Sequence, residues 1–598
     1  MKHNLFIGAL LLAVIGWGGC SVQQPASSGT AGKYSNILNI RYTPDSVSRC
    51  RGWFTDAGAW YGFTIPKQEQ WVNGFCGPFH LDMNKRQWLS DALVKVRFDG
   101  EEPDAVYTPD SVSYFPGELY MSSSSKTGRI EQRLVFVDKS TALLTCSSDR
   151  KTLLRFSGEV LPGDVVCTTD KNRVLLTWPS GEGVALTFSP EMGILSSEKG
   201  YETLTLTPGR SDVVISFFEN EASRQSVLHR ATVVQASPSG YREETARRWE
   251  GYLDKVLRPD MPEVYNRIAV KAVVTLIANW KSARGDLFHD GVAPSHAVGY
   301  FMGFWGWDSW KHAVALARFA PELAKDQVHT MFDYQTPEGM IIDCIYSDAS
   351  ENNARDSKPP LAAWAVDEIY KATGDTAFVK EMYPKLLHYY KWWFTHRDHN
   401  NNGICEFGSC DGTLEAAAWE SGMDNAIRFD NAVMVKNSEG AWSMDQESVD
   451  LNAFLALEHR LLTKLAPVAG AVFDEPDKLA QVQDYFFVSD PGFFFDKRLD
   501  GTSVMEEGTE ACIPLWAEIA SKEQAAAVMK IFSDTTKFAT YIPSRQLQQI
   551  IQSLCRPVIG GGLSGWIRFI SEYPVFAGMD IKKRPMPLPI RYLPVCKA

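Results

Sequence analysis

Two carboxylates lie four residues apart in the stretch Trp419-Glu420-Ser421-Gly422-Met423-Asp424, beside an indole and a glycine. A carboxyl group among apolar neighbours stays protonated to a higher pH than one in water. The stretch therefore indicates Asp424 as a candidate general acid. The same spacing would place Glu420 and Asp424 on one helical face, where they could simply pair with Arg428. The sequence alone leaves that structural alternative open.

Three further stretches mix aromatic rings with amides and charged side chains. They are Phe304–Lys311, Glu351–Pro360 and Gln446–Asp450. Aromatic faces suit the C–H faces of a sugar ring, and the polar groups suit its hydroxyls. The set predicts a carbohydrate site, although Asp308 taken singly could be the N-cap of the helix it begins.

The order and spacing of four sequence blocks carry a resemblance. The blocks are W-G-W-D-S-W, N-x-R-x-S-K-P-P-L-A-A-W, W-E-S-G-x-D and Q-E-S-V-D, and with them the sequence resembles glycoside hydrolase family 63 over most of residues 34–543. Within that family it is similar to the bacterial α-glucosidase-like branch, which is related in fold to the trehalases. The resemblance implies inverting hydrolysis of α-glucosidic bonds in oligosaccharides, with Asp424 as the acid. The sugar-binding residues that it implies are Trp307, Asp308, Arg355, Lys358, Trp419, Glu420 and Glu510.

An inverting glycosidase also needs a second carboxylate, about 6.5–9.5 Å from the acid, to activate water. In the family this general base lies near the C-terminus, after a Y-W-R-G-P-x-W block, and this sequence contains neither. Codons for Val558–Phe569, read one base earlier, can give G-Y-W-R-G-P-V-W-L-D-Q-V, so we expect residues 544–598 to be an out-of-frame tail. A catalytically inactive carbohydrate-binding remnant therefore stays open as the alternative function.

The length and the residue patterns predict a multidomain chain, because 598 residues exceed one ordinary core. Residues 34–237 contain short β-branched runs divided by Pro-Gly turns, which favours an N-terminal β-sandwich. Residues 238–260 are expected to form a linker helix. Residues 261–543 carry apolar residues at helical spacing with no strand pattern between them, which disfavours a TIM barrel. For this second part the resemblance implies an (α/α)6 toroid, incomplete at its C-terminal end.

Aromatic pairs in the first domain raise a separate possibility. Trp53-Phe54, Trp60-Tyr61 and Trp71 could bind carbohydrate if they were exposed. We interpret this domain instead as a scaffold for the second one.

One loop in the helical part alternates oxygen-bearing side chains. Asp398, Asn400 and Asn402 precede Gly403, and the Ile404 carbonyl and Glu406 complete the set. Such a pattern suits Ca²⁺, and the resembling glucosidases carry a similar loop, so we predict a structural calcium ion. An Asn/Gly-rich turn without an ion is the alternative. The cysteines show no zinc-type spacing, and no organic cofactor is expected.

The N-terminus predicts export. Met1–Asn4 and the apolar run Leu5–Gly18 resemble a signal peptide over residues 1–19. Gly19-Cys20 resembles a lipoprotein cleavage site, so we expect lipid on Cys20, a tether over residues 20–33, and a periplasmic or outer-membrane-anchored bacterial lipoprotein; simple secretion is the alternative. A net charge of -12 argues against nucleic acid as a partner, and we expect a monomer that binds an oligosaccharide.

Overall fold

The structure, a computed structural model, describes residues 29–44, 52–82, 86–161, 163–189, 192–196, 200–477 and 479–539. The described chain forms two compact units. The first comprises the residues up to Phe54 with Phe63–Phe79 and Trp88–Glu250, and the second comprises Thr55–Gly62, His80–Gln87 and the residues from Gly251 onward. The division falls within α2 (Pro238–Val256). The predicted signal peptide, Cys20 and the tail from residue 544 lie outside the described residues.

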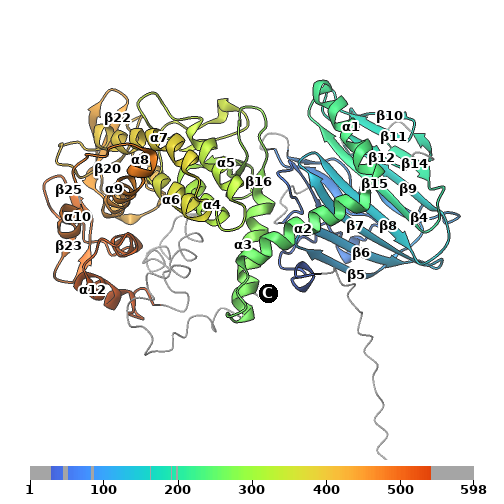
Figure 1. Ribbon diagram of the computed structural model, residues 1–598, viewed down its shortest axis with the longest axis horizontal. Helices are drawn as coiled ribbons and strands as arrows, with labels where there is room; N and C mark the ends of the chain where they lie inside the picture. Colours follow the sequence, from blue (N-terminus) through green and yellow to red (C-terminus); the bar gives the residue numbers. More distant parts are fainter. Residues whose placement is uncertain are drawn as a thin grey trace, which may run out of the picture. The chain divides into compact units, whose positions relative to one another are not determined.

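The first unit is rich in antiparallel β-structure (Figure 1). An eight-stranded sheet has the order β10-β11-β12-β15-β8-β7-β6-β5, and a four-stranded sheet has the order β13-β14-β9-β4. Their strands are β4 Lys95–Phe98, β5 Thr108–Phe115, β6 Glu118–Ser124, β7 Arg129–Asp138, β8 Thr141–Ser148, β9 Leu154–Glu159, β10 Val166–Asp170, β11 Arg173–Thr177, β12 Gly183–Thr187, β13 Gly193–Ser196, β14 Gly200–Leu204 and β15 Arg210–Phe218. A smaller sheet contains β1 (Tyr61–Thr64), β2 (Cys76–His80) and β3 (Gln87–Trp88).

A helix, α1 (Glu221–Ala236), replaces strand structure at the end of the region predicted to be all β. It begins with a capping box, because the Asn220 side chain accepts from the Ser223 amide at 2.9 Å and the Ser223 hydroxyl accepts from the Asn220 amide at 3.2 Å. Its apolar face packs on the eight-stranded sheet, with Ala231 and Val234 among Val135, Leu143 and Val214 (Figure 1). The region predicted as a β-sandwich therefore ends in a helix that covers the sheet.

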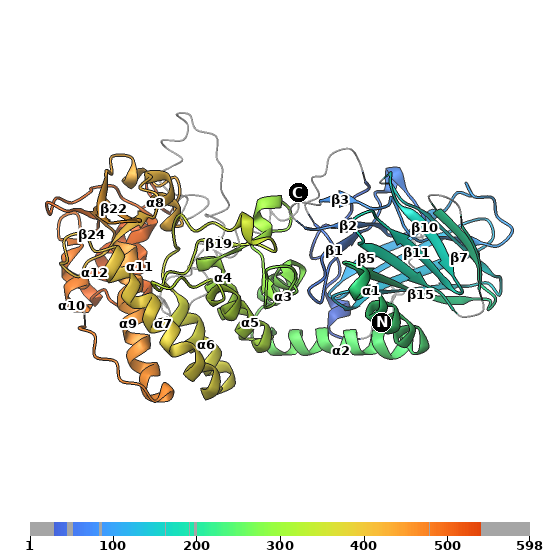
Figure 2. The same ribbon diagram turned by 90° about the horizontal axis from the view of Figure 1, so that it is seen from above.

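The second unit is mainly helical, as expected (Figure 2). α4, α5, α6, α7 and α9 pack against one another and enclose buried tryptophans such as Trp310 and Trp393. The helices are α3 Glu263–Asn279, α4 Gly306–Leu316, α5 Pro321–Phe332, α6 Ala362–Thr373, α7 Thr376–His396, α8 Leu414–Glu420, α9 Val449–Ala469, α10 Leu479–Tyr485, α11 Ile513–Trp516 and α12 Lys522–Phe532.

Short antiparallel strands nevertheless occur between these helices, so the expectation of an uninterrupted helical pattern was wrong. They are β16 Trp280–Lys281, β17 Gly291–Val292, β18 Phe304–Trp305, β19 Cys344–Ile345, β20 Glu406–Ser409, β21 Met434–Ser438, β22 Ala441–Glu447, β23 Phe487–Val488, β24 Phe493–Phe494 and β25 Lys497–Arg498. Most are too short to show a period of two in the sequence. β22 ends at Glu447, and α9 begins two residues later at Val449.

The aromatic pairs near the N-terminus are buried. Trp53, Phe54, Trp60 and Tyr61 expose 1%, 2%, 4% and 6% of their surfaces, which excludes them as an exposed sugar-binding platform. In the part of the chain that the structure describes, no helix is both long and apolar enough to cross a membrane.

Candidate active site

Asp424 lies in a tight turn that follows α8. The Ser421 hydroxyl donates to the Ala418 carbonyl at 2.6 Å and accepts from the Met423 amide at 3.0 Å, which closes the turn. Gly422 adopts a φ of 67°, a left-handed conformation that favours glycine. The Asp424 side chain beyond this turn is exposed to solvent.

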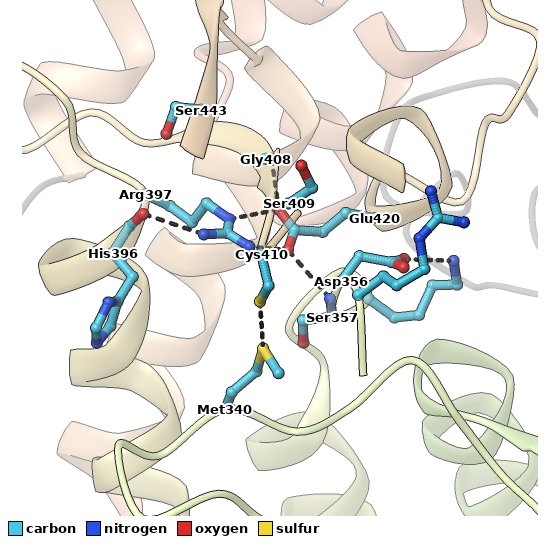
Figure 3. A network of polar contacts seen from close by, with 12 residues as sticks. Met340, Asp356, Ser357, His396, Arg397, Gly408, Ser409, Cys410, Glu420 and Ser443 are labelled. Atoms are coloured by element: carbon cyan, nitrogen blue, oxygen red, sulfur yellow. Dashed lines mark hydrogen bonds and ion pairs between the residues drawn. The ribbon is translucent and has the colours of Figure 1, made fainter. Parts of the chain in front are cut away.

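Glu420, the last residue of α8, is fully buried and accepts four hydrogen bonds (Figure 3). Arg397 donates from Nε and Nη2, each at 2.8 Å, and the amides of Ser357 and Gly408 donate at 3.1 and 2.6 Å. Both carboxylate oxygens are thereby occupied. The structure thus places Glu420 behind the site, not in the direct sugar contact that the sequence predicted.

Trp307 and Asp308 lie in the first turn of α4. The N-cap of this helix is Trp305, so Asp308 does not cap it but carries a charge near its positive end. Trp307 is only 5% exposed, and the Lys311 Nζ lies 3.2 Å from the centroid of its ring. A Cβ added to Gly422 would lie 2.8 Å from Cζ2 of Trp307, so the turn before Asp424 packs directly on this indole.

Lys358 joins the same site from an extended segment before α6. Its Nζ lies 2.9 Å from Asp343 Oδ1 and 3.5 Å from Asp356 Oδ2, and it also donates to the Trp419 carbonyl. Burial opposes the charge of Lys358, but Asp343 and Asp356 outweigh it and raise the pKa of the amine above its ordinary value. Asp343 is a site residue that sequence reasoning missed.

The electrostatics around Asp424 favour a proton donor. Removal of surrounding water raises the pKa of Asp424; the charge of Lys358 opposes this shift and that of Asp308 adds to it. Although the side chain is exposed, its carboxyl is enclosed enough to lose part of its hydration. A reachable carboxyl group that stays protonated to a higher pH can protonate a glycosidic oxygen.

Arg355 and Trp419 are partly exposed beside this centre. The Arg355 guanidinium lies 5.0 Å from the centroid of the Trp419 ring. It donates to Asp411 at 2.6 Å and to the Thr413 hydroxyl at 3.0 Å, and Thr413 is the N-cap of α8. Arg355 therefore fixes the beginning of the helix whose end precedes Asp424.

Glu510 belongs to a different group of charges. Arg428 forms buried ion pairs with Asp450 at 2.8 Å and Asp496 at 2.9 Å, so it does not serve as the partner of Glu420 that the structural alternative required. Burial raises the pKa of Glu510 to about 7; Arg428 opposes this shift, and Asp496 and Asp450 add to it.

The side-chain oxygens of the predicted calcium loop turn inward onto the loop backbone. Asp398 accepts from the Asn402 and Gly403 amides at 3.0 and 2.8 Å, Asn400 accepts from the Asn402 amide at 3.1 Å, and Asn402 accepts from the Ile404 amide at 2.7 Å. Among the described residues, no group of three or more acidic, histidine or cysteine side chains has the geometry of a metal site.

The surroundings of Glu406 still fit a cation. One of its oxygens is buried without a hydrogen-bond partner. Burial raises the pKa of Glu406; a hydrogen bond from the His399 amide opposes this shift, and the charges of Glu447 and Asp398 add to it. A bound cation would satisfy the oxygen and offset the repulsion.

One segment of the chain is similar to a known glycoside hydrolase domain. Residues 302–549 match the mannosylglycerate hydrolase MGH1-like glycoside hydrolase domain. The mannosylglycerate hydrolase MGH2 of Selaginella moellendorffii is 25% identical over 157 residues, which cover 23% of this chain and 30% of that protein. The mannosylglycerate hydrolase of Thermus thermophilus is 27% identical over 159 residues, covering 23% of this chain and 36% of that protein. The chain thus spans about a third of the length of these relatives.

Among solved structures, the crystal structure of a GH63 mannosylglycerate hydrolase from Thermus thermophilus with Tris and D-glycerate is similar at a TM-score of 0.37 and 19% identity, covering 44% of this chain and 76% of that chain. The matched domain contains Trp307, Asp308, Arg355, Lys358, Asp424 and Glu510. By this domain match and these curated relatives, residues 302–549 are similar to the glycoside hydrolase domain of mannosylglycerate hydrolases.

Proposed function

We propose that this protein is an inverting glycoside hydrolase in which Asp424 protonates the leaving oxygen. The observation that carries the proposal is the placement of Asp424: an exposed carboxyl with a raised pKa, on a turn that packs on Trp307 and is tied to Lys358. These groups come from distant stretches of the chain and meet at one site. Asp343 and Lys358 hold the backbone at Trp419, and Trp307 supplies an apolar wall.

For the substrate we propose a neutral α-linked glucoside. The relatives are named for mannosylglycerate, whose glycerate carries a carboxylate that a cation would have to recognise. The described cations at this site are already engaged: Lys358 by Asp343 and Asp356, Arg355 by Asp411 and Glu415, and Lys311 by the ring of Trp307. A site of this charge pattern favours an uncharged aglycone.

The complete fold and the general base belong to the same proposal. We propose a β-sandwich followed by an (α/α)6 toroid, with the base restored when the reading frame is shifted after Pro543. The test is to assay the 598-residue chain and the frame-restored chain against α-glucosides, α-mannosides and mannosylglycerate, following the released anomer by NMR.

We expect the restored chain to release the β-anomer from α-glucosides. The chain as written should be slower by ~10²–10⁴-fold, the usual contribution of general base catalysis. Ordinary rates from the 598-residue chain would show that the base lies within it, and Glu447 and Glu510 would then be tested first. Saturable sugar binding without hydrolysis by either form would instead establish a carbohydrate-binding remnant.

We also propose that the protein is exported as a lipoprotein with lipid on Cys20. Metabolic labelling with palmitate should mark the wild-type protein and not the Cys20→Ala variant. Label that is unchanged by this substitution would refute the anchor.

A further inference from the structure

Arg397 and Glu420 form a fully buried ion pair at the end of α8, four residues before Asp424. Both side chains are 0% exposed, and the guanidinium binds the carboxylate through two hydrogen bonds of 2.8 Å each (Figure 3). Taking two charges out of water is costly unless their geometry is well satisfied. Amide donors from Ser357 and Gly408 complete the satisfaction of this pair.

Arg397 is itself held rigidly at the end of α7. Its Nη1 donates to the His396 carbonyl at 3.1 Å, and its guanidinium lies 4.7 Å from the ring centroid of Trp392. A Cβ on Gly408 would lie 2.7 Å from Arg397 Nε, so only glycine leaves room for the guanidinium beside β20. These contacts hold the Arg397 guanidinium in place independently of its ion pair with Glu420.

Glu420 joins the segments around it. Besides Arg397, it accepts from the amide of Gly408 in β20 and from the amide of Ser357, which precedes Lys358. Lys358 in turn donates to the carbonyl of Trp419, the residue before Glu420. The end of α8 is therefore tied to both segments that support the site.

We propose that Arg397 is a positioning residue: through Glu420 it fixes the turn that carries Asp424 and the backbone from which Lys358 extends. The inference rests on the proposed role of Asp424 as general acid. A planar guanidinium sets two distances and one orientation at once, which the single charge of a lysine does not. Arg397→Lys therefore keeps the positive charge but loses the paired hydrogen bonds from Nε and Nη2 to Glu420.

The first test measures sensitivity to the leaving group, in whichever form of the full chain hydrolyses α-glucosides. A poor leaving group such as an alkoxide needs protonation by Asp424, whereas a dinitrophenolate does not. We expect Arg397→Lys to reduce kcat about 10²-fold on an alkyl glucoside, the cost of a displacement of about 1 Å, and far less on the dinitrophenyl glucoside. Equal losses on both substrates would overturn the inference.

The matched control is Ser521→Ala. Ser521 caps α12 through the Gln524 amide at 3.1 Å, so this variant loosens the same unit without touching Arg397, Glu420 or Asp424. It should leave the ratio of the two rates unchanged. A shift of the ratio in this control as large as that in Arg397→Lys would show a general structural effect and overturn the inference.

A second measurement does not need activity. Hydrogen exchange of the amides in residues 419–426 should accelerate in Arg397→Lys and not in Ser521→Ala, where the acceleration should fall in α12. Unchanged exchange at 419–426 would refute the positioning role even if no glycoside is hydrolysed. Absence of hydrolysis by every wild-type form, with the expected exchange pattern, would refute the proposed function alone.

Discussion

Gly422 lies in contact with the indole of Trp307: a Cβ at this glycine would stand 2.8 Å from Cζ2 and 2.9 Å from Cε2 of that ring. The turn that carries Asp424 is therefore shaped by an aromatic side chain from α4. We expect Gly422→Ala to destabilise the protein in two ways, through the left-handed φ of 67° and through this contact. The positive φ costs about 1–2 kcal/mol, and overpacking adds about 1–3 kcal/mol. Denaturant unfolding measures the sum.

Gly440→Ala separates the two effects. Gly440 has nearly the same φ, 68°, but nothing lies within 4 Å of its added Cβ. It should show the conformational cost alone. If the two variants lose the same stability, the contact with Trp307 contributes nothing.

Asp308→Asn should shift the pH dependence of the reaction. The charge of Asp308 adds to the raised pKa of Asp424, although loss of hydration is the larger cause. An acid must be protonated to act, so activity falls as the pH rises through this pKa. Removing the charge lowers the pKa, and the basic limb of kcat/KM against pH should move to lower pH. A limb that stays in place or moves up would show that Asp308 does not act on Asp424 electrostatically.

Lys281 should make the stability depend on pH above neutrality. It is 0% exposed and donates to the carbonyls of Ala59 and Trp280 at 3.1 and 3.0 Å, and burial lowers its pKa from 10.5 to about 7. Between these values the unfolded chain binds more protons, so the free energy of unfolding should rise with pH, by at most about 1.4 kcal/mol per unit.

The difference between wild type and Lys281→Met isolates this contribution. The variant should lack the slope between pH 7 and 10, measured by urea unfolding. Lys255→Met is the control, because Lys255 is exposed and also donates to a carbonyl, that of Phe319 at 3.1 Å. Parallel curves for wild type and Lys281→Met would show that the amine stays charged in the fold.

Calcium should stabilise the protein through the loop at Asp398–Glu406. At about 100 times its Kd an ion adds about 2.7 kcal/mol, so chelation should lower Tm by several degrees. Glu406→Gln should abolish both the shift and the calorimetric binding of Ca²⁺. Asp500→Asn, in another turn closed by an aspartate through Thr502 at 2.9 Å, should abolish neither. Absence of Ca²⁺ binding by wild type would leave the loop as a turn.

Sequence patterns predicted the parts of this site that are local. The W-G-W-D and W-E-S-G-x-D blocks indicate Trp307, Asp308 and Asp424 as candidates, because their residue types are unusual together. The role of Arg397 was not predicted, because the residues around position 397 do not indicate that it pairs with Glu420, 23 residues later. Asp343 was not predicted for the same reason, because only the tertiary fold brings it to its partner Lys358. β20 and β22 were not predicted either, because their pairing depends on residues far apart in the chain. Helical periodicity, in contrast, depends only on neighbouring residues.

The partners of Glu420 all precede it in the chain. The amide of Gly408 lies 12 residues earlier, Arg397 lies 23 earlier and the amide of Ser357 lies 63 earlier. Trp307, against which Gly422 packs, comes earlier still. Because the ribosome makes the chain from its N-terminus, these three partner residues are synthesised before Glu420. Asp424 is thus made after every residue described here as supporting its turn, so the turn can close without waiting for any of them to be synthesised.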